Sequence, residues 1–347
     1  MSAERTVKRR RVLDILERED GDAVWLTSAT ALSWYLDGAR VHTSLLGAPI
    51  AAVRIDAEGE RVRVFANELD RLVAEELPAG ISVEPVAWHD PLVPESRSPR
   101  VFAEERVADG LRAARAALLP EERARYAALC RDTAAALTAQ LPLSHPEESE
   151  RALAARVSAA LVAVGADPAV VMVAGSARSQ HRHPLPSTAP LGSRAMVVVC
   201  ARRHGLIANV TRWVRFGPAD PAAADRDAAI RAVEADAFRA TRVGTTLGDV
   251  LSEIAAAYPR HGFAADEWTR HHQGGAAGYA GRDPRAVPGA TDVVRNGQAF
   301  AWNPTAPGHK IEDTVIVDDG RVTVLTRDGE WPEVDVDGVP RPLEWER

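Results

Sequence analysis

The second half of this sequence gathers the side chains that could carry chemistry, in short groups separated by apolar runs. These residues are His181, Arg182, His183, Asn209, Arg212, His271, His272, Tyr279, Arg282, Trp302, Asn303, His309 and Glu312. A histidine with a near-neutral pKa can take a proton from water and return it to a leaving nitrogen. Amide side chains both donate and accept hydrogen bonds, and arginine can hold a carboxylate through two parallel bonds. Together these residue types suit hydrolysis or binding of an amide, amidine or carboxylate compound.

Composition limits the class of protein. The chain has 347 residues, of which 46% are hydrophobic and 26% charged, so it can bury a large core and favours two domains. The formal net charge is −7, and no basic block extends beyond residues 8–11, which argues against nucleic-acid binding. The longest apolar run, residues 195–201, is far shorter than the roughly 20 residues of a membrane span, and no signal-peptide pattern opens the chain. We expect a soluble, cytoplasmic protein without a membrane partner.

The two cysteines predict neither a disulfide framework nor a structural zinc site. Cys130 and Cys200 lie far apart, and neither belongs to a Cys-x-x-Cys pair or a Cys/His cluster. We interpret both as small buried hydrophobic residues.

The first part of the chain alternates helical and strand-like segments, which indicates a small α/β domain. We expect helices over 7–19, 30–35 and 67–76 and strands over 23–26, 51–55 and 61–65. The proline-rich stretch 90–100 breaks this pattern, so we place a first domain at 1–118 and a second at 119–347.

The second part predicts two helices, then strands, then two helices and strands again, which suggests two similar halves. The expected helices are 121–141, 148–164, 221–239 and 247–258, and the expected strands are 170–173, 195–201, 207–216, 299–302, 314–317 and 322–325. Gly165 is a plausible cap for the second helix.

Five landmarks in this part resemble the creatinase, aminopeptidase P, prolidase and methionine aminopeptidase family. They are His181-Arg182-His183-Pro184, the run from Gly205 to Arg212, His272-Gln273-Gly274-Gly275, Trp302-Asn303-Pro304 and Ile311-Glu312-Asp313-Thr314-Val315. The resemblance covers roughly residues 120–330. It implies an α+β protein in which a pita-bread C-terminal domain follows a smaller creatinase-like α/β N-terminal domain. It also implies a homodimer.

The same resemblance weakens the expectation of metal chemistry. Peptidases of this family bind two divalent metals through two Asp, one His and two Glu, and the corresponding positions here are Val198, Asn209, His272, Asn303 and Glu312. Only His272 and Glu312 keep the ligand type. Because hard divalent ions are held by carboxylate charge, we expect no metal cofactor.

The resemblance assigns catalytic roles to several residues. His183, before Pro184, occupies the place of the family's mobile-loop histidine and would act as the acid/base, although an ungapped count fits His181 equally well. His272 would hydrogen-bond or polarise the substrate. Tyr279, in a stretch similar to the Tyr-Gly-Arg-Glu of creatinase, would donate to a developing oxyanion. Glu312 would carry a buried charge that needs a cationic partner, either a substrate group or Arg282.

The candidate substrate-binding residues are Asn209, Asn303, Arg282, Arg212 and Trp302. Several of the catalytic and substrate-binding roles have a structural alternative. His183 or His181 could be a solvated loop histidine. Arg212 and Glu312 could each form an ion pair that only stabilises the fold, and Trp302 could belong to the core rather than line the site.

These residues predict a metal-independent, creatinase-like hydrolase of a C–N bond in a small amide, amidine or peptide-like substrate, with histidine as acid/base. One alternative is an Xaa-Pro aminopeptidase or prolidase-like metallopeptidase using Mn²⁺, Co²⁺ or Zn²⁺, with extra ligands from His271, His309, Asp283 or Asp313. The other is a catalytically inert pseudo-peptidase that acts as a binding module.

Overall fold

The computed structural model describes residues 2–347, and this part of the chain divides into two compact units. The first comprises 2–115, 119–122 and 204–206, and the second comprises 116–118, 123–203 and 207–347. No helix within residues 2–347 is both long and apolar enough to cross a membrane.

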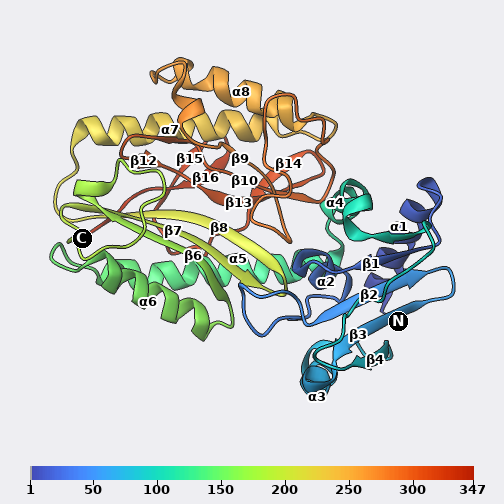
Figure 1. Ribbon diagram of the computed structural model, residues 1–347. Helices are drawn as coiled ribbons and strands as arrows, with labels where there is room; N and C mark the ends of the chain where they lie inside the picture. Colours follow the sequence, from blue (N-terminus) through green and yellow to red (C-terminus); the bar gives the residue numbers. More distant parts are fainter. Residues whose placement is uncertain (1) are drawn as a thin grey trace. The chain divides into compact units, whose positions relative to one another are not determined.

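The first unit is built on a five-stranded sheet in the order β4-β3-β2-β1-β5 (Figure 1). Its strands are β1 (Ala23–Leu26), β2 (Ala51–Asp56), β3 (Glu60–Phe65), β4 (Ser82–Val86) and β5 (Val101–Ala103). Its helices are α1 (Ala3–Arg18), α2 (Ala29–Tyr35), α3 (Leu69–Arg71) and α4 (Ala108–Ala116), with short helical turns at Ala66–Glu68, Leu72–Glu76 and Glu104–Val107. The strands expected over 23–26, 51–55 and 61–65 are present.

The two edge strands of this sheet were not expected from the sequence. β4 contains Pro85, which cannot donate a ladder hydrogen bond and is tolerated because the strand lies at the sheet edge. β5 begins directly after the proline-rich stretch 90–100 and pairs in parallel with β1 at the opposite edge. The proline-rich stretch therefore joins the two edges of one sheet.

The second unit places two sheets between two pairs of helices (Figure 1). One sheet has the order β17-β8-β7-β6 and the other β14-β13-β10-β9. The strands are β6 (Asp167–Gly175), β7 (Arg194–Arg203), β8 (Leu206–Arg215), β9 (Gly274–Ala277), β10 (Gln298–Trp302), β13 (Asp313–Asp318), β14 (Arg321–Val324) and β17 (Trp345–Glu346). Two small hairpins pair β11 (Thr305–Ala306) with β12 (His309–Lys310) and β15 (Glu333–Val336) with β16 (Val339–Pro342).

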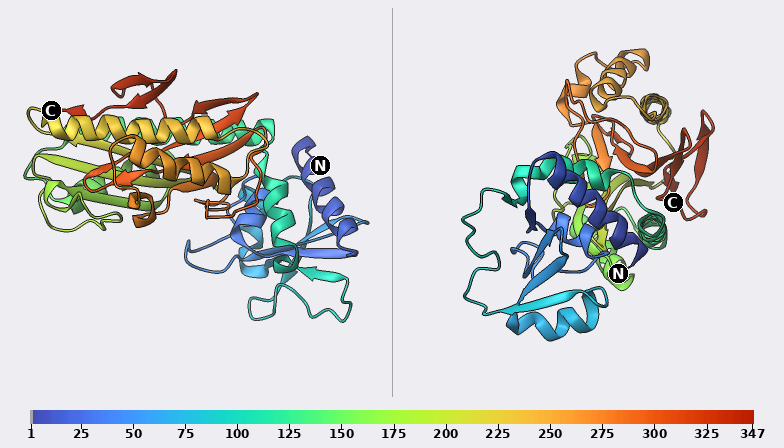
Figure 2. Two further views of the ribbon diagram at one scale, coloured as in Figure 1. Left: turned by 90° about the horizontal axis from the view of Figure 1, so that it is seen from above. Right: turned by 90° about the vertical axis from the view of Figure 1, so that its right-hand side faces the viewer.

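The four long helices of this unit match the expected ones closely. α5 (Pro120–Gln140) and α6 (Glu150–Ala163) lie on one side of the sheets, and α7 (Pro221–Ala240) and α8 (Leu247–Arg260) lie side by side on the other (Figures 1 and 2). Short helical turns occupy Leu141–Leu143, Ser176–Arg178 and Glu267–Arg270. This is the α+β arrangement expected from the sequence.

Local sequence sets the ends of these helices. The side chains of Ser149, Asp220 and Thr246 cap α6, α7 and α8 by accepting backbone N–H bonds, which satisfies donors that a helix start leaves free. After α6, Gly165 takes a left-handed φ of 74°, as its assignment to a helix cap requires. Apolar residues of α7 and α8 pack on β10 and β13 to form a buried core that includes Ile254 and Phe300.

Candidate functional site

Strand β8, strand β13 and the residue just before β13 bring four polar residues together inside the second unit. The backbone N–H of Thr211 donates to the Glu312 carbonyl at 2.9 Å, and the Thr211 hydroxyl donates to the Glu312 carboxylate at 3.3 Å. The Thr314 hydroxyl bonds both the N–H and the carbonyl of Asn209, at 2.8 and 3.0 Å. Because side chains alternate along a strand, Asn209 and Thr211 share the face of β8 that meets Glu312.

Two cations bind the Glu312 carboxylate, which is almost fully buried. The Arg282 guanidinium lies 2.5 Å from Glu312 and donates a second bond to Asn209 Oδ1 at 3.0 Å. The Lys310 ammonium lies 3.3 Å from the other carboxylate oxygen. Burial alone would raise the pKa of Glu312, but the charges of Lys310 and Arg282 lower it to about 2. We call Asn209, Arg282, Lys310 and Glu312 the Glu312 network.

The next residue along the chain faces the opposite way. Asp313 pairs with Arg212 at 2.9 Å and with Arg341 at 2.8 Å, and all three side chains are buried. Arg212 also donates to the carbonyls of Thr211 and Thr326. The structure thus places Arg212 in a buried ion pair with Asp313, apart from the Glu312 network.

Three histidines form a second group. One ligand atom from each of His183, His271 and His272 lies within 4.8 Å of the others, and Nε2 of His183 is 3.0 Å from Nε2 of His271. The rings of His271 and His272 stack with centroids 4.3 Å apart, and the His183 ring lies 4.7 and 5.7 Å from them. His183 is exposed, His272 half-buried and His271 buried. We call these residues the histidine cluster.

The surroundings of the cluster keep its rings neutral. Burial, reinforced by the charge of Lys310, lowers the pKa of His271 to about 2. Burial and the charges of Arg282 and Arg285 lower the pKa of His272 to about 4. Burial and Lys310 also lower the pKa of His183. The cluster therefore offers neutral imidazoles at neutral pH.

The loop that carries His183 is anchored at several points. Arg182 forms an ion pair with Glu267, four residues before His271, and donates to the Thr305 hydroxyl at 3.0 Å. These bonds hold His183 against His271, although 88 residues separate the two in the chain.

A buried carboxylate fixes the base of the same loop. Glu150, at the start of α6, accepts bonds from Gly175 N–H at 2.9 Å and from the N–H and hydroxyl of Ser187 at 2.9 and 2.7 Å. It also pairs with Arg178, whose guanidinium donates to the Leu185 carbonyl. Both ends of the loop thus meet at one side chain.

Close backbone packing positions the segment after the cluster. In the antiparallel pair β9–β10, Gly274 has φ +112°, and a Cβ added there would lie 2.2 Å from the Ala301 carbonyl oxygen. Only glycine fits this position. The backbone N–H of Asn303 donates to the Gln273 carbonyl at 3.0 Å, which holds Asn303 beside the cluster segment. The Oδ1 atom of Asn303 is buried without a hydrogen-bond partner.

Other predicted residues take different places. Trp302 is fully buried and stacks on Phe300 in the α7–α8 core. Tyr279 is buried and begins the segment that leads to Arg282. His181 is exposed and is not a member of the histidine cluster, so the structure brings His183, and not His181, together with His271 and His272.

Two members of the site have roles that the sequence reasoning missed. The sequence suggests His271 only as an extra metal ligand and assigns no role to Lys310. Lys310 had a detectable signal, because it precedes Glu312 by two residues and an extended chain places such residues on one face. Of the other proposed extra ligands, His309 pairs with Asp227 at 2.7 Å and Asp313 pairs with two arginines.

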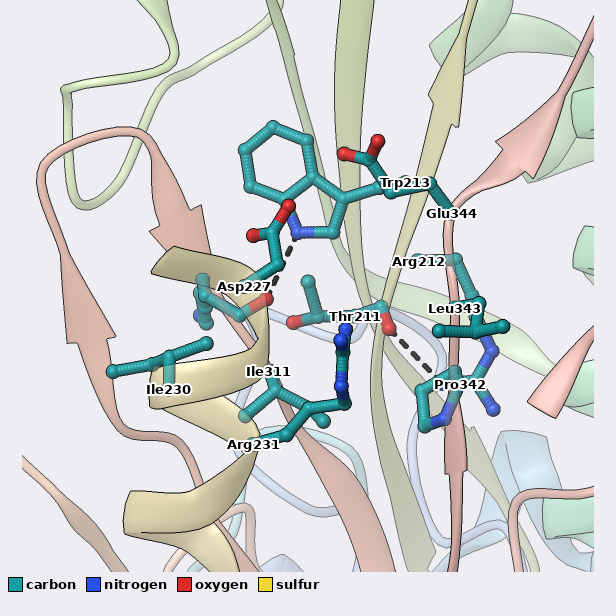
Figure 3. A pocket seen from close by; sticks show the side chains of 11 residues that line it. Thr211, Arg212, Trp213, Asp227, Ile230, Arg231, Ile311, Pro342, Leu343 and Glu344 are labelled. Carbon is teal, nitrogen blue, oxygen red and sulfur yellow. Dashed lines mark hydrogen bonds between the residues drawn. The ribbon is translucent and has the colours of Figure 1, made fainter. Parts of the chain in front are cut away.

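A small cavity lies between residues of β8 and α7 (Figure 3). Lys310 of the Glu312 network is part of its lining. The cavity has a volume of about 20 Å³, and its lining also includes Thr211, Asp227 and Arg231. This space can hold a water molecule but not an organic substrate.

Comparisons with known proteins agree with this architecture. The sequence model of metallopeptidase family M24 matches residues 124–319, more than half of the chain. The chain belongs to metallopeptidase family M24. Members of this family are hydrolases that act on C–N peptide bonds. A search of curated protein sequences found no significant match.

Solved structures share the fold at low sequence identity. A prolidase from Pyrococcus horikoshii superposes with a TM-score of 0.78 at 19% identity, covering 92% of this chain and 98% of the prolidase. An Xaa-Pro dipeptidase from Bacillus anthracis superposes with a TM-score of 0.77 at 14% identity, covering 99% of this chain and 100% of the dipeptidase. The N-terminal domain of the FACT complex subunit SPT16 from chickpea superposes with a TM-score of 0.70 at 13% identity, covering 95% of this chain and 98% of the SPT16 domain. The pita-bread fold of this M24 chain is therefore shared with peptidases and with a subunit of a protein complex.

The residues present do not fit a two-metal centre at the positions that the family resemblance assigns. Val198 packs in an apolar cluster with Ala174, Met196 and Trp213. Asn209 Oδ1 accepts bonds from Arg282 and from the Cys200 thiol, and Glu312 is bound by two cations. A divalent ion at these positions would lie beside positive side chains and lack the carboxylates that bridge two ions.

Proposed function

We propose that this M24 protein is a hydrolase that cleaves a C–N bond of a small amide, amidine or short-peptide substrate. The proposed route is creatinase-like and needs no dinuclear metal centre. One observation carries this proposal: the guanidinium of Arg282 and the ammonium of Lys310 occupy the carboxylate of Glu312, which a two-metal site would need as a ligand.

In this route the histidine cluster activates water. His183 is the exposed member and is neutral at neutral pH, so it can accept a proton from water. When its Nε2–H donates to His271, its Nδ1 atom is left free to act as the base. The water oxygen bonds to the amide or amidine carbon, the C–N bond breaks, and His183 returns the proton to the leaving nitrogen. An amide then yields a carboxylic acid and an amine.

The neighbouring polar atoms suit such a substrate. Asn303 Oδ1 is a buried acceptor without a partner, and Arg282 Nε is a buried donor without a partner. Because an unpaired buried polar atom costs free energy, a bound amide or amidine that pairs with these atoms is favoured. The fixed charges of Arg282 and Lys310 would also stabilise negative charge that develops on the substrate.

A second candidate, a catalytically inert binding module, has one observation in its favour. The fold is shared with the N-terminal domain of the FACT complex subunit SPT16, which is not described as a peptidase. The same assay separates the two candidates, because a binding module hydrolyses nothing.

The test measures hydrolysis of a panel of N-acyl amino acids, amidines and Xaa-Pro dipeptides before and after chelator treatment. We expect hydrolysis that chelation does not reduce and that His183→Ala lowers by about 10²–10⁴-fold, the usual contribution of a general acid/base. The matched control is His145→Ala, an exposed histidine at the start of the loop before α6. Two equivalents of bound metal with chelator-sensitive cleavage would overturn the proposal, as would loss of activity in His181→Ala but not in His183→Ala.

A further inference from the structure

The histidine cluster has the composition of a metal site that differs from the family's two-ion centre. Its three donors are all imidazole nitrogens, and they lie within 4.8 Å of one another. They come from two segments, the loop after β6 and the residues just before β9. The Arg182–Glu267 ion pair ties these two segments together, so the approach of the rings is built into the fold.

A hydrogen bond between two of the rings leaves other ring nitrogens of the histidine cluster without a partner. The contact between His183 and His271 uses one nitrogen of each ring. The Nδ1 atoms of His271 and His272 are buried and have no hydrogen-bond partner. Buried polar atoms without partners are uncommon in native proteins and call for an explanation such as a missing water or ion.

We propose that His183, His271 and His272 form a binding site for one divalent transition-metal ion of the zinc class. Neutral imidazole is a preferred ligand for Zn²⁺, Cu²⁺, Ni²⁺ and Fe²⁺, whereas Mg²⁺, Ca²⁺ and Mn²⁺ prefer carboxylate and carbonyl oxygen. Three protein ligands with an open fourth position are a common arrangement for zinc. The ligand set therefore selects a different class of ion from the carboxylate centre of the family peptidases.

The charges around the cluster limit it to a single ion. Arg282, Arg285 and Lys310 act on these histidines together with one carboxylate, Glu312. This excess of positive charge weakens the binding of one divalent ion by the imidazoles and opposes a second ion nearby more strongly. It also favours an anion, such as hydroxide or chloride, in the open position of the bound ion.

Ion binding should affect the hydrolysis proposed above, and this expected effect rests on the proposed function. The ion takes the one basic lone pair of the neutral His183 ring, which would otherwise accept the proton of water. Zinc should therefore inhibit hydrolysis by the histidine acid/base route. Binding of the ion itself does not depend on which substrate the protein hydrolyses.

The test measures binding directly. The full-length protein, stripped with a chelator, is titrated with Zn²⁺ by calorimetry and with Co²⁺ by visible absorption, whose intensity reports the coordination geometry of the bound ion. We expect one equivalent of tightly bound ion. His271→Ala and His183→Ala each remove a direct ligand. Each should lower the affinity for the ion by more than the roughly 10–100-fold that loss of an outer-shell partner causes. The exposed His145→Ala control should bind like the unaltered protein.

The variants keep the proposal falsifiable. Removal of the buried His271 ring can disturb folding, whereas His183 is exposed and its removal leaves the buried rings in place. Unfolding midpoints measured without metal identify any misfolded variant. Absence of a one-to-one complex, or equal affinity in His183→Ala and the unaltered protein, would overturn the site. Hydrolysis that rises with zinc would support the ion site but overturn the metal-free route of the proposed function. Failure to find any substrate would overturn the proposed function and leave the binding result intact.

Discussion

The guanidinium of Arg282 bonds both the carboxylate of Glu312, at 2.5 Å, and the amide oxygen of Asn209, at 3.0 Å. One side chain thus joins the end of the segment after β9, strand β8 and the start of β13. In the family resemblance, positions 209 and 312 belong to metal ligands. The guanidinium of Arg282 links these two positions in this structure.

Replacement of Arg282 should therefore destabilise the fold. In Arg282→Met, Glu312 keeps only Lys310 as a cationic partner, and breaking a buried ion pair costs about 3–5 kcal/mol. We expect a loss of about 3 kcal/mol in the free energy of unfolding, measured by denaturant titration. The control is Arg61→Met, because Arg61 and Glu84 form an exposed pair and such pairs contribute less than about 1 kcal/mol. Equal effects of the two substitutions would contradict the structural role of Arg282.

The sequence predicted the orientation of Glu312 but not the full set of its partners. Alternation along β13 correctly placed Glu312 and Asp313 on opposite faces, because the pleat of a strand leaves no other choice. The same rule applied to Lys310 would have found the second cation. Arg282 was named as a possible partner, but only the fold brings it to both Asn209 and Glu312.

The histidine cluster could not be derived from the sequence in the same way. His271 and His272 are neighbours in the chain, yet their approach to His183 depends on a loop anchored by Arg182, Glu267 and Glu150. In the sequence these three residues look like ordinary charged residues of the protein surface. The four long helices and most strands were predictable because their hydrophobic periodicity is local, whereas β4 was hidden by Pro85.

Glu150 should control the order of the loop that carries His183. Burial alone would raise its pKa, but bonds from Gly175 and Ser187 and the charge of Arg178 hold the pKa below its usual 4.5. The folded state therefore binds this proton less tightly than the unfolded state. The stabilisation is complete above about pH 4.5 and is lost as the pH falls below that value.

In Glu150→Gln we expect the free energy of unfolding to fall by about 1–3 kcal/mol at neutral pH, the range for hydrogen bonds to a charged group. Faster hydrogen exchange over residues 176–190 should accompany this loss. The difference from the unaltered protein should shrink below pH 4.5. Glu147→Gln is the matched control, because Glu147 is exposed and its partner is the exposed His145. A pH-independent difference would contradict the role of the Glu150 charge.

Gly274→Ala should disrupt the strand pair that positions His272 and Asn303. The added Cβ would lie 2.2 Å from the Ala301 carbonyl oxygen, and the φ of +112° is strained for alanine. We expect a loss of about 3 kcal/mol or more in the free energy of unfolding. Gly59→Ala serves as the control, since no atom lies within 4 Å of its added Cβ and its φ is not positive. Similar unfolding curves for the two variants would argue against close β9–β10 packing.

The substitution Trp302→Phe tests whether Trp302 belongs to the core or lines the substrate site. Trp302 is fully buried, stacks on Phe300 with an interplanar angle of 6°, and has an indole N–H without a partner. Phenylalanine keeps an aromatic ring there and removes the unpaired donor, so we expect a loss of only about 1–2 kcal/mol from the smaller ring. The KM of any substrate found in the hydrolysis panel should stay within about twofold, since a core residue makes no substrate contact. A large rise in KM at unchanged stability would instead place Trp302 in the substrate site.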